Sequence, residues 1–246
     1  MPSTEPVLLS IVIPILNEAA GIEAFLAQVR AAFPSAQVLL VDGGSDDDTV
    51  GIALQAGVPV LLSEPGRAQQ MNLGAAAAQG QWLLFLHADS DIDFGQDALF
   101  PLLESAGDGP VWGFFSVQLL GRSALLPIVT WCMNHRSRLT RVATGDQGLF
   151  VRRSTFEAIG GYAQIPLMED IELSKRLRRI AAPLRPAPRI RASGRRWDEQ
   201  GAMATIVRMW GLRFAFWIGV SPRRLWHHYY GRRALGESRR PVESHV

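Results

Sequence analysis

The sequence has little cysteine and no long uninterrupted apolar run. Cys132 is the only cysteine among 246 residues, which excludes an internal disulfide, and its place in the apolar run Ile128–Met133 favours a packed core residue. No stretch reaches about 18 consecutive apolar residues, as a transmembrane helix would need. The first residues also lack the basic and apolar regions of a signal peptide. We therefore expect a globular protein in a reducing, cytoplasmic location.

Lysine is almost absent, and the charges are unevenly distributed. Lys175 is the only lysine among 25 basic residues. Residues 1–170 hold 8 basic and 18 acidic residues, a net of −10, whereas residues 171–246 hold 17 and 5, a net of +12. Arginine binds phosphate bidentately, so the basic end suggests an anionic partner such as a diphosphate, an anionic membrane surface or nucleic acid. A solvated arginine-rich face explains the same pattern equally well.

Strand and helix patterns alternate over the first 90 residues. Apolar runs typical of buried strands are separated by segments with helical spacing. The runs are Leu8–Ile13, Gln37–Val41, Val58–Leu62 and Trp82–Leu86, and the expected helices are Ala20–Phe33, Thr49–Ala56 and Ala68–Ala78. Continuous apolar strands that alternate with helices predict an α/β fold, in which helices cover both faces of a mainly parallel sheet.

Polar residues follow each of these strands. In parallel sheets, ligands bind beyond the carboxyl ends of the strands. The residues in that position are Asn17 and Glu18, Asp42 to Asp48, Gly66 and Arg67, and His87 and Asp89. The sequence therefore predicts that the strand ends converge on one polar crevice.

Two of these groups are rich in carboxylates. The segment Asp42–Thr49 has two glycines for a tight turn and acids that can accept hydrogen bonds from a base or ribose, although a polar turn that caps the next helix explains it as well. The segment His87–Asp93 places carboxylates where Mg²⁺ or Mn²⁺ would share oxygen ligands with phosphates. An EF-hand is excluded, because Phe94 and Phe100 stand where its glycine and glutamate would be.

Two further segments have residues suited to ligand chemistry. Gly66–Gly74 opens a helix with an arginine near its start, which suits anion binding, but it is neither a P-loop nor a G-x-G-x-x-G motif. Glu169 and Asp170 are adjacent carboxylates that raise each other's pKa, so one of them could act as a general base. Acidic residues at a helix start also complement the helix dipole, and this second interpretation stays open.

The second half of the chain is less regular. We expect one long strand at Val111–Leu120 and helices at Leu125–Met133, Ser154–Ile159, Asp170–Arg179 and Ala202–Val220. The last of these helices is dominated by aromatic residues. Residues 237–246 are expected to be disordered.

In their order along the chain, these segments resemble the motifs of the family 2 glycosyltransferases. Ile11-Val12-Ile13-Pro14 with Asn17-Glu18 is similar to the I-P-x-x-N-E signature, Asp42 with Ser45, Asp47 and Thr49 to V-D-x-x-S-x-D-x-T, and Asn72 with Gly74 to N-x-G. His87-Ala88-Asp89 falls at the D-x-D motif with histidine in the first position, Glu169-Asp170 matches E-D, and Arg195-Arg196-Trp197 resembles the end of Q-x-x-R-W. With Gly66-Arg67 and Gly145-Asp146-Gln147-Gly148, the chain resembles a small uncharacterised bacterial subgroup.

The resemblance implies a role for each matched residue. Asp170 would be the catalytic base, and Asp89 the ligand of a divalent metal, Mn²⁺ or Mg²⁺. The residues implied in binding a nucleotide-sugar donor, with a UDP-sugar favoured, are Pro14, Asn17, Glu18, Asp42, Asp47, Arg67, Asn72, His87 and Asp89. The residues implied in contacting the acceptor or the diphosphate are Gln147, Glu169, Arg196 and Trp197.

The resemblance also implies a fold and a reaction. A GT-A domain would span residues 1–200, with a nucleotide-binding half at about 8–90 and an acceptor half at about 110–200. A helical extension at 201–236 and a tail at 237–246 would follow. The reaction would be an inverting transfer to a hydroxyl of an unidentified acceptor, with a lipid-linked acceptor as one option. Nucleic acid is not an expected partner.

Two other functions are weighed against this one. A non-catalytic, membrane-associated adaptor that binds nucleotide sugars is suggested by the aromatic segments Trp210–Trp217 and Trp226–Tyr230 with their flanking arginines, which suit peripheral contact with the inner face of a membrane. Packing against the transferase domain explains the same aromatic residues. A sugar-nucleotide pyrophosphorylase is disfavoured, because Pro14–Glu18 lacks a glycine-rich basic loop.

Overall fold

The computed structural model describes residues 7–107, 109–193 and 202–230. Arg195, Arg196, Trp197 and the tail 237–246 lie outside these residues.

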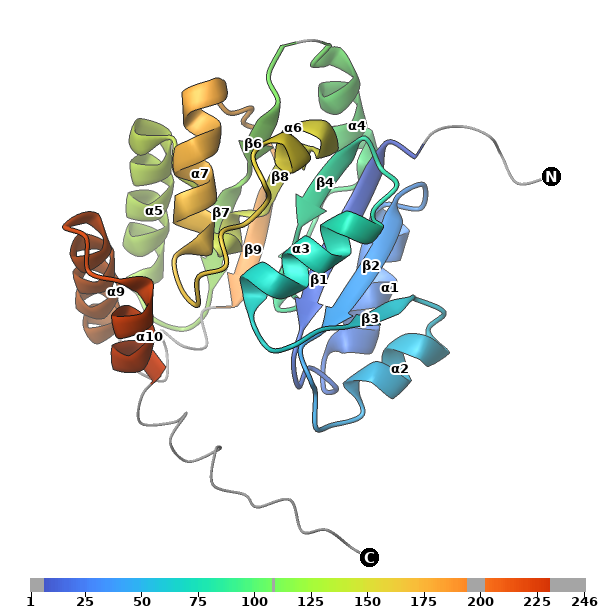
Figure 1. The fold of residues 1–246 in the computed structure, drawn as a ribbon, viewed down its shortest axis with the longest axis horizontal. Helices are drawn as coiled ribbons and strands as arrows, with labels where there is room; N and C mark the ends of the chain where they lie inside the picture. Colours follow the sequence, from blue (N-terminus) through green and yellow to red (C-terminus); the bar gives the residue numbers. More distant parts are fainter. Residues whose placement is uncertain (1–6, 108, 194–201, 231–246) are drawn as a thin grey trace, which may run out of the picture.

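A six-stranded sheet forms the centre of the protein, with the strand order β3-β2-β1-β4-β8-β6 (Figure 1). Its strands are β1 (Leu9–Ile15), β2 (Gln37–Asp42), β3 (Val60–Leu62), β4 (Trp82–Phe85), β6 (Trp112–Phe114) and β8 (Leu149–Arg152). The first four run parallel, whereas β8 is antiparallel to both of its neighbours. The sheet is mainly parallel, as the apolar runs predict.

Helices cover both faces of this sheet. The flanking helices are α1 (Ile22–Ala32), α2 (Thr49–Gln55), α3 (Arg67–Ala77), α4 (Gln96–Ser105), α6 (Arg153–Ala158) and α7 (Glu169–Ile180). Side chains of α1 and α4 pack with Ile11 and Ile13 of β1, whereas those of α3, α6 and α7 share a second cluster with Val12. Neighbouring β1 residues thus face opposite layers, which explains why this strand lacks polar alternation.

Gly74 lets α3 lie close to the sheet. A Cβ atom at this position would be 2.4 Å from Cγ1 of Val12 and 2.9 Å from Cγ2 of Val41. The close packing of α3 brings its first residues, beginning with Arg67, to the ends of β1 and β2.

The segment 111–120 forms two strands rather than the single strand that we expect from the sequence. Trp112–Phe114 is β6 of the main sheet, whereas Ser116–Leu120 is β7 of a three-stranded sheet with the order β5-β9-β7. Its other members are β5 (Ser90–Ile92) and β9 (Arg189–Ser193). The chain changes sheets at Phe115, whose N–H donates to the carbonyl oxygen of Gln147 at 2.8 Å.

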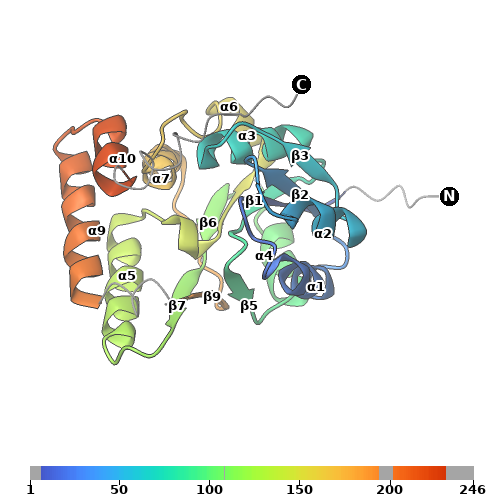
Figure 2. The same cartoon turned by 90° about the horizontal axis from the view of Figure 1, so that it is seen from below.

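The C-terminal helices pack along α5 and α7 (Figure 2). These helices are α9 (Ala202–Trp217) and α10 (Pro222–Tyr230), and α5 spans Leu126–Thr140. Leu212 of α9 and Leu225 of α10 are buried in one cluster with Met168 and Ile171. Within the described ranges, no helix combines the length and apolarity needed to cross a membrane.

Candidate active site

The loops after β1 and β2 form one hydrogen-bonded unit. Asn17 has a φ of 56°, a left-handed conformation that asparagine tolerates. Its N–H donates to Ser45 Oγ at 2.9 Å, while its Oδ1 accepts the N–H of Asp46 at 2.8 Å. The N–H of Glu18 donates to Thr49 Oγ1 at 2.8 Å. The structure therefore brings together residues of two sequence motifs that are about 30 positions apart.

The acids of the second loop hold its backbone in place. The buried Asp42 accepts the N–H groups of Gly44 and Ser45 at 2.9 and 3.0 Å. Asp47 accepts from the Thr49 hydroxyl and from the N–H of Ala19, and these hydrogen bonds lower the pKa of Asp47. Asp47 also accepts the N–H of Thr49 at 3.0 Å, but the side chain of Asp48, the residue before α2, makes no capping hydrogen bond. The role of Asp42 and Asp47 in binding a donor stays a prediction.

Gln70 of α3 connects the two loops to the ends of β1 and β2. Its side-chain amide is buried and donates to the carbonyl oxygens of Ile15 at 2.9 Å and Val41 at 2.8 Å, at the ends of β1 and β2. No motif in the sequence singles out Gln70. The only signal was a polar residue at a position of α3 that faces the core.

Asp170 lies at the start of α7, where backbone groups orient its carboxylate. Oδ2 accepts the N–H of Gly145 and Oδ1 accepts the N–H of Ile171, both at 2.7 Å. Desolvation raises the pKa of Asp170 and outweighs these hydrogen bonds, which lower it. A carboxylate with fixed geometry and a raised pKa is suited to accept a proton.

Glu169 is buried beside Asp170, with 7% of its surface exposed. Desolvation and the charge of Asp170 raise the pKa of Glu169 to about 7, and Arg67 partly offsets this increase. Desolvation lowers the pKa of Arg67, but the charges of Glu169 and other nearby acids outweigh it. The pKa of Arg67 is therefore raised. The starts of α3 and α7 thus bring a cation beside two carboxyl groups.

His87 lies against the turn that holds Asp170. A Cβ atom on Gly145 would be 2.7 Å from Cε1 and 2.8 Å from Nε2 of the imidazole. Desolvation and the charge of Arg67 lower the pKa of His87 to about 3, with Asp89 acting in the opposite direction. The imidazole is therefore neutral at physiological pH, and the exposed Asp89 supplies the carboxylate at the end of β4.

The comparisons with known proteins agree with this arrangement. Residues 10–118 match the family model described as Glycosyl transferase family 2. Over this segment, which is less than half of the chain, the sequence is similar to that family. An uncharacterized glycosyltransferase of Mycobacterium tuberculosis is 31% identical over 156 residues, which cover 59% of each chain. The matched part is therefore less than two thirds of the length of that relative.

Solved structures show the same fold. A mannosyltransferase from Pyrobaculum calidifontis, in complex with GDP-Man and Mn²⁺, superposes with a TM-score of 0.60 at 19% identity, over 86% of this chain and 62% of that one. A glucosyl-3-phosphoglycerate synthase from Mycobacterium tuberculosis, in complex with Mn²⁺, UDP and glucosyl-3-phosphoglycerate, has a TM-score of 0.52 at 19% identity, with coverages of 76% and 70%. The chain has the GT-A fold that the family resemblance implies.

Gln147 lies in the core, and the contact with an acceptor or a diphosphate that the family resemblance implies for it stays a prediction. None of its side chain is exposed. Its Oε1 accepts from Ser137 Oγ at 2.8 Å and from the N–H of Thr144 at 3.1 Å, and its Nε2 donates to the carbonyl oxygen of Phe115 at 3.3 Å. Through these hydrogen bonds, Gln147 supports the turn that contains Gly145.

Asn72, from the N-x-G motif of the family, connects two distant segments. Its Nδ2 donates to the carbonyl oxygen of Tyr162 at 2.9 Å, and its Oδ1 accepts the N–H of the same residue at 2.8 Å. These hydrogen bonds fix the segment that leads to Glu169 against α3. The predicted contact of Asn72 with a donor stays a prediction beside this supporting role.

Two arginines near Asp170 have no counterpart in the motifs that we identified. Arg136 comes from α5 and Arg213 from α9, and both interact electrostatically with Asp170. Desolvation lowers the pKa of each of them. The sequence held only a weak signal for them, namely the excess of arginine towards its end, because helix packing rather than a local motif brings them to the site.

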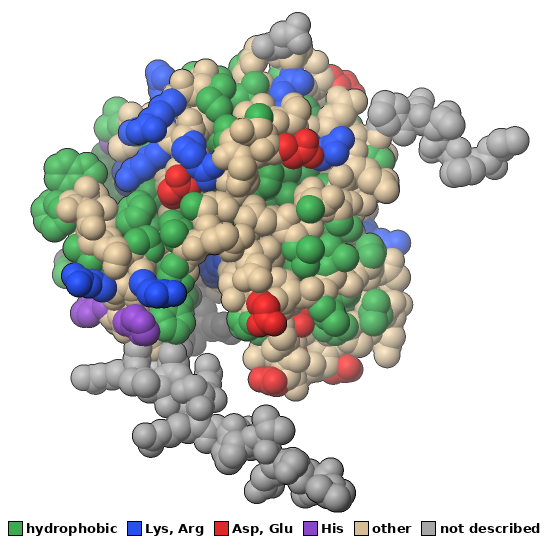
Figure 3. Space-filling model, in the orientation of Figure 1, with side chains coloured by type: hydrophobic (Ala, Val, Ile, Leu, Met, Phe, Trp, Pro, Cys, Tyr) green, Lys and Arg blue, Asp and Glu red, His purple; other side chains and the backbone are tan. Residues whose placement is uncertain are grey.

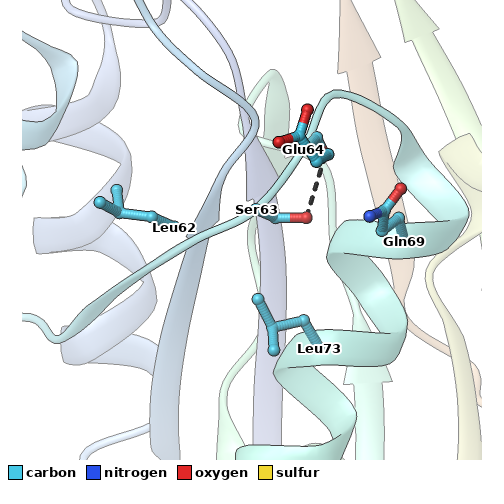
Figure 4. Close-up of a pocket in the computed structure, with 5 residues that line it drawn as sticks. All are labelled: Leu62, Ser63, Glu64, Gln69 and Leu73. Atoms are coloured by element: carbon cyan, nitrogen blue, oxygen red, sulfur yellow. Dashed lines mark hydrogen bonds between the residues drawn. The ribbon is translucent and has the colours of Figure 1, made fainter.

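A surface depression of about 460 Å³ lies beside the start of α3 (Figure 4). Leu62, Ser63 and Glu64 line it from the end of β3, and Gln69 and Leu73 line it from α3. None of the residues that we predicted for the site lines this depression. It lies at the end of the outermost parallel strand, next in sequence to Gly66 and Arg67.

Proposed function

We propose that the chain transfers a sugar from a nucleoside-diphosphate donor, with a UDP-sugar favoured, to a hydroxyl of an acceptor with inversion. The observation that carries the proposal is the oriented Asp170 carboxylate with its raised pKa, next to the cation Arg67. The family match and two structural neighbours that hold UDP or GDP-Man with Mn²⁺ support a nucleotide-sugar donor.

In this proposal, Asp170 acts as the general base. The N–H groups of Gly145 and Ile171 hold its carboxylate while it takes the proton of the acceptor hydroxyl. The acceptor oxygen forms a bond to the anomeric carbon from the face opposite the leaving group, and the bond to the diphosphate oxygen breaks. Arg67 is placed to offset the charge that develops on that oxygen.

Asp89 and His87 are the residues that would hold a divalent cation. A carboxylate and a neutral imidazole are both competent ligands of Mn²⁺, and the carboxylate alone suits Mg²⁺. Across the described ranges, no three His, Cys, Asp or Glu side chains group as a metal site, so the donor and water would supply further ligands. Such an ion neutralises negative charge on the diphosphate.

A thermal-shift panel of UDP-, GDP-, dTDP- and CDP-sugars, with and without Mn²⁺, tests the donor. Saturation at about 100 times the Kd should stabilise the protein by about 2.7 kcal/mol, or roughly 5–10 °C for a chain of this size. We expect the largest shift for a UDP-sugar with Mn²⁺, and Asp89→Asn should remove the metal-dependent part. The absence of a shift with every donor would refute the proposal.

Asp170→Asn tests the base separately from donor binding. This variant should keep the donor-induced shift but lose turnover by about 10²–10⁴-fold. Turnover can be followed as nucleoside diphosphate released from the donor. Unchanged turnover in Asp170→Asn would exclude Asp170 as the base, whereas donor binding without turnover in the unmodified protein would favour the non-catalytic adaptor.

An aromatic face on α9 suggests peripheral contact with a membrane, and hence a lipid-linked acceptor. The exposed fractions on this face are 67% for Val207, 63% for Trp210, 61% for Phe214, 73% for Trp217 and 58% for Ile218. Apolar side chains gather along α9, and basic and histidine side chains gather over α10 (Figure 3). Aromatic side chains beside cationic ones suit an anionic lipid surface.

Co-sedimentation with vesicles tests this contact. We expect the protein to bind vesicles that contain phosphatidylglycerol more strongly than vesicles of phosphatidylcholine alone. The variant Trp210→Ser/Trp217→Ser should lose most of this binding but keep its thermal stability, because both side chains are exposed. Binding that does not depend on anionic lipid would exclude the membrane contact.

A further inference from the structure

We propose that Arg136 and Arg213 form a binding site for a phosphate group of the acceptor, next to the Asp170 carboxylate. This inference rests on the proposed function, because it names the chemical class of the acceptor at the same site. It starts from two helices that the sequence motifs leave without a role.

Contacts of the helices place both arginines around the start of α7. Arg136 donates through Nη1 to the carbonyl oxygen of Val142 at 3.2 Å and through Nη2 to Ser137 Oγ at 3.0 Å, and so borders the turn whose Gly145 holds Asp170. Arg213 follows Leu212, which is buried with Val142, Met168 and Ile171 in one apolar cluster. Asp170 lies between Met168 and Ile171 in the chain, so this cluster holds α9 against the start of α7, and Arg213 interacts electrostatically with Asp170.

Both guanidinium groups keep an enclosed donor without a partner. Within the described part of the chain, the Nε atoms of Arg136 and Arg213 are buried and make no hydrogen bond. An unpaired buried donor is destabilising, and more so when it is charged. Arg152 shares this property, but its guanidinium stacks over Trp82 and donates to the carbonyl oxygen of Gly107, far from this site in the fold.

The two arginines also repel each other. Desolvation and the charge of Arg213 lower the pKa of Arg136 to about 10, and Asp170 only partly offsets this. An anion between the guanidinium groups would remove the repulsion. A phosphate suits this place because it carries up to two negative charges and accepts hydrogen bonds from arginine in bidentate geometry.

The position of the pair favours the acceptor over the donor as the source of the phosphate. Arg67, His87 and Asp89 lie at the ends of the parallel strands, within the segment 10–118 that matches the family. Arg136 and Arg213 lie beyond that segment, on α5 and α9. They therefore approach Asp170 from helices that differ from the elements of the predicted donor site.

Calorimetric titration of inorganic phosphate into protein saturated with UDP and Mg²⁺ tests the site. We expect phosphate to bind this complex, and Arg136→Met and Arg213→Met each to weaken that binding by at least tenfold. Arg213→Lys should have an intermediate affinity, since it keeps the charge but loses the bidentate geometry. The affinity for UDP should change by less than twofold in all three variants.

Arg153→Met is the matched control. Its Nε donates to the carbonyl oxygen of Gly80, which precedes β4 at the edge of the sheet opposite the site. This control should bind phosphate as the unmodified protein does. Thermal unfolding of each variant shows whether it is folded. If Arg213→Met does not fold, Arg213→Lys still tests the site.

Several outcomes would overturn the inference. Phosphate affinity that is unchanged in both methionine variants would show that the arginines do not form the site. If UDP displaces phosphate, and both variants lose UDP and phosphate affinity together, the pair serves the donor diphosphate and the assignment to the acceptor is wrong. If no nucleotide binds while phosphate binding to the free protein still requires the arginines, the proposed donor fails and the phosphate site stands.

Discussion

Replacement of Glu169 by glutamine should change how stability depends on pH. The side chain is 7% exposed, and desolvation together with Asp170 raises the pKa of Glu169 to about 7. In the unfolded chain the same carboxyl group has its ordinary pKa near 4.5. The native state therefore binds a proton more tightly than the unfolded state does, and Glu169→Gln removes that difference with little change in shape.

The expected magnitude follows from the two pKa values. A difference between about 4.5 and about 7 corresponds to about 3 kcal/mol of unfolding free energy. Because the pKa is raised on folding, this contribution is fully present below pH 4.5 and is lost as the pH rises through about 7. The unfolding free energy of Glu169→Gln, relative to that of the unmodified protein, should thus increase by up to about 3 kcal/mol from low to high pH.

Urea denaturation between pH 5 and pH 8 measures this effect. The difference in unfolding free energy between Glu169→Gln and the unmodified protein should widen with pH, at similar m-values. Glu157→Gln is the control, since Glu157 is 60% exposed and pairs only at the surface with Arg153. Its pH profile should run parallel to that of the unmodified protein. If the profile of Glu169→Gln is also parallel, Glu169 is not desolvated as described.

Three further substitutions test the framework around the site. Gly145→Ala would place a Cβ atom 2.7 Å from Cε1 of His87, so kcat/KM in steady-state kinetics should fall at least tenfold. An unchanged kcat/KM would contradict the close contact. Gln147→Leu removes the hydrogen-bond acceptor of a fully buried network and should lower the unfolding free energy, measured by urea denaturation, by about 2–4 kcal/mol. Little change in that free energy would show that the network is dispensable. Asn72→Ala loses both hydrogen bonds to Tyr162 and should lower the unfolding free energy by about 1–3 kcal/mol. Amide hydrogen exchange near Tyr162 should become faster. Unaltered exchange would show that the connection is not needed.

The first half of the fold could be predicted because its signals are local. The runs Leu8–Ile13 and Trp82–Leu86 lie between two helical layers, and such strands read as continuous apolar segments. The helices of the second half were also expected, but its strands escaped prediction because they are short and paired at long range. The change of sheet at Phe115 depends on a hydrogen bond to Gln147, which no pattern within 111–120 reveals.

The candidate site divides in the same way. Asp89, Glu169 and Asp170 are found from the sequence because they stand at strand or helix ends with recognisable spacing. Arg136 and Arg213 are not, because their place beside Asp170 depends on how α5 and α9 pack against α7. Gln147 was named through the family resemblance, and its polar groups are used within the core.

The single lysine of the chain makes one helix contact chemically addressable. Nζ of Lys175 lies 4.7 Å from the ring centroid of Phe216, where α7 meets α9. An amine-directed fluorophore would attach only there and at the chain's own α-amino group. A lysine-specific protease would likewise have one cleavage site, at the helix that begins with Glu169 and Asp170. Native proteolysis or labelling at Lys175 would thus report directly on release of α9 from the site, without the introduction of any foreign residue.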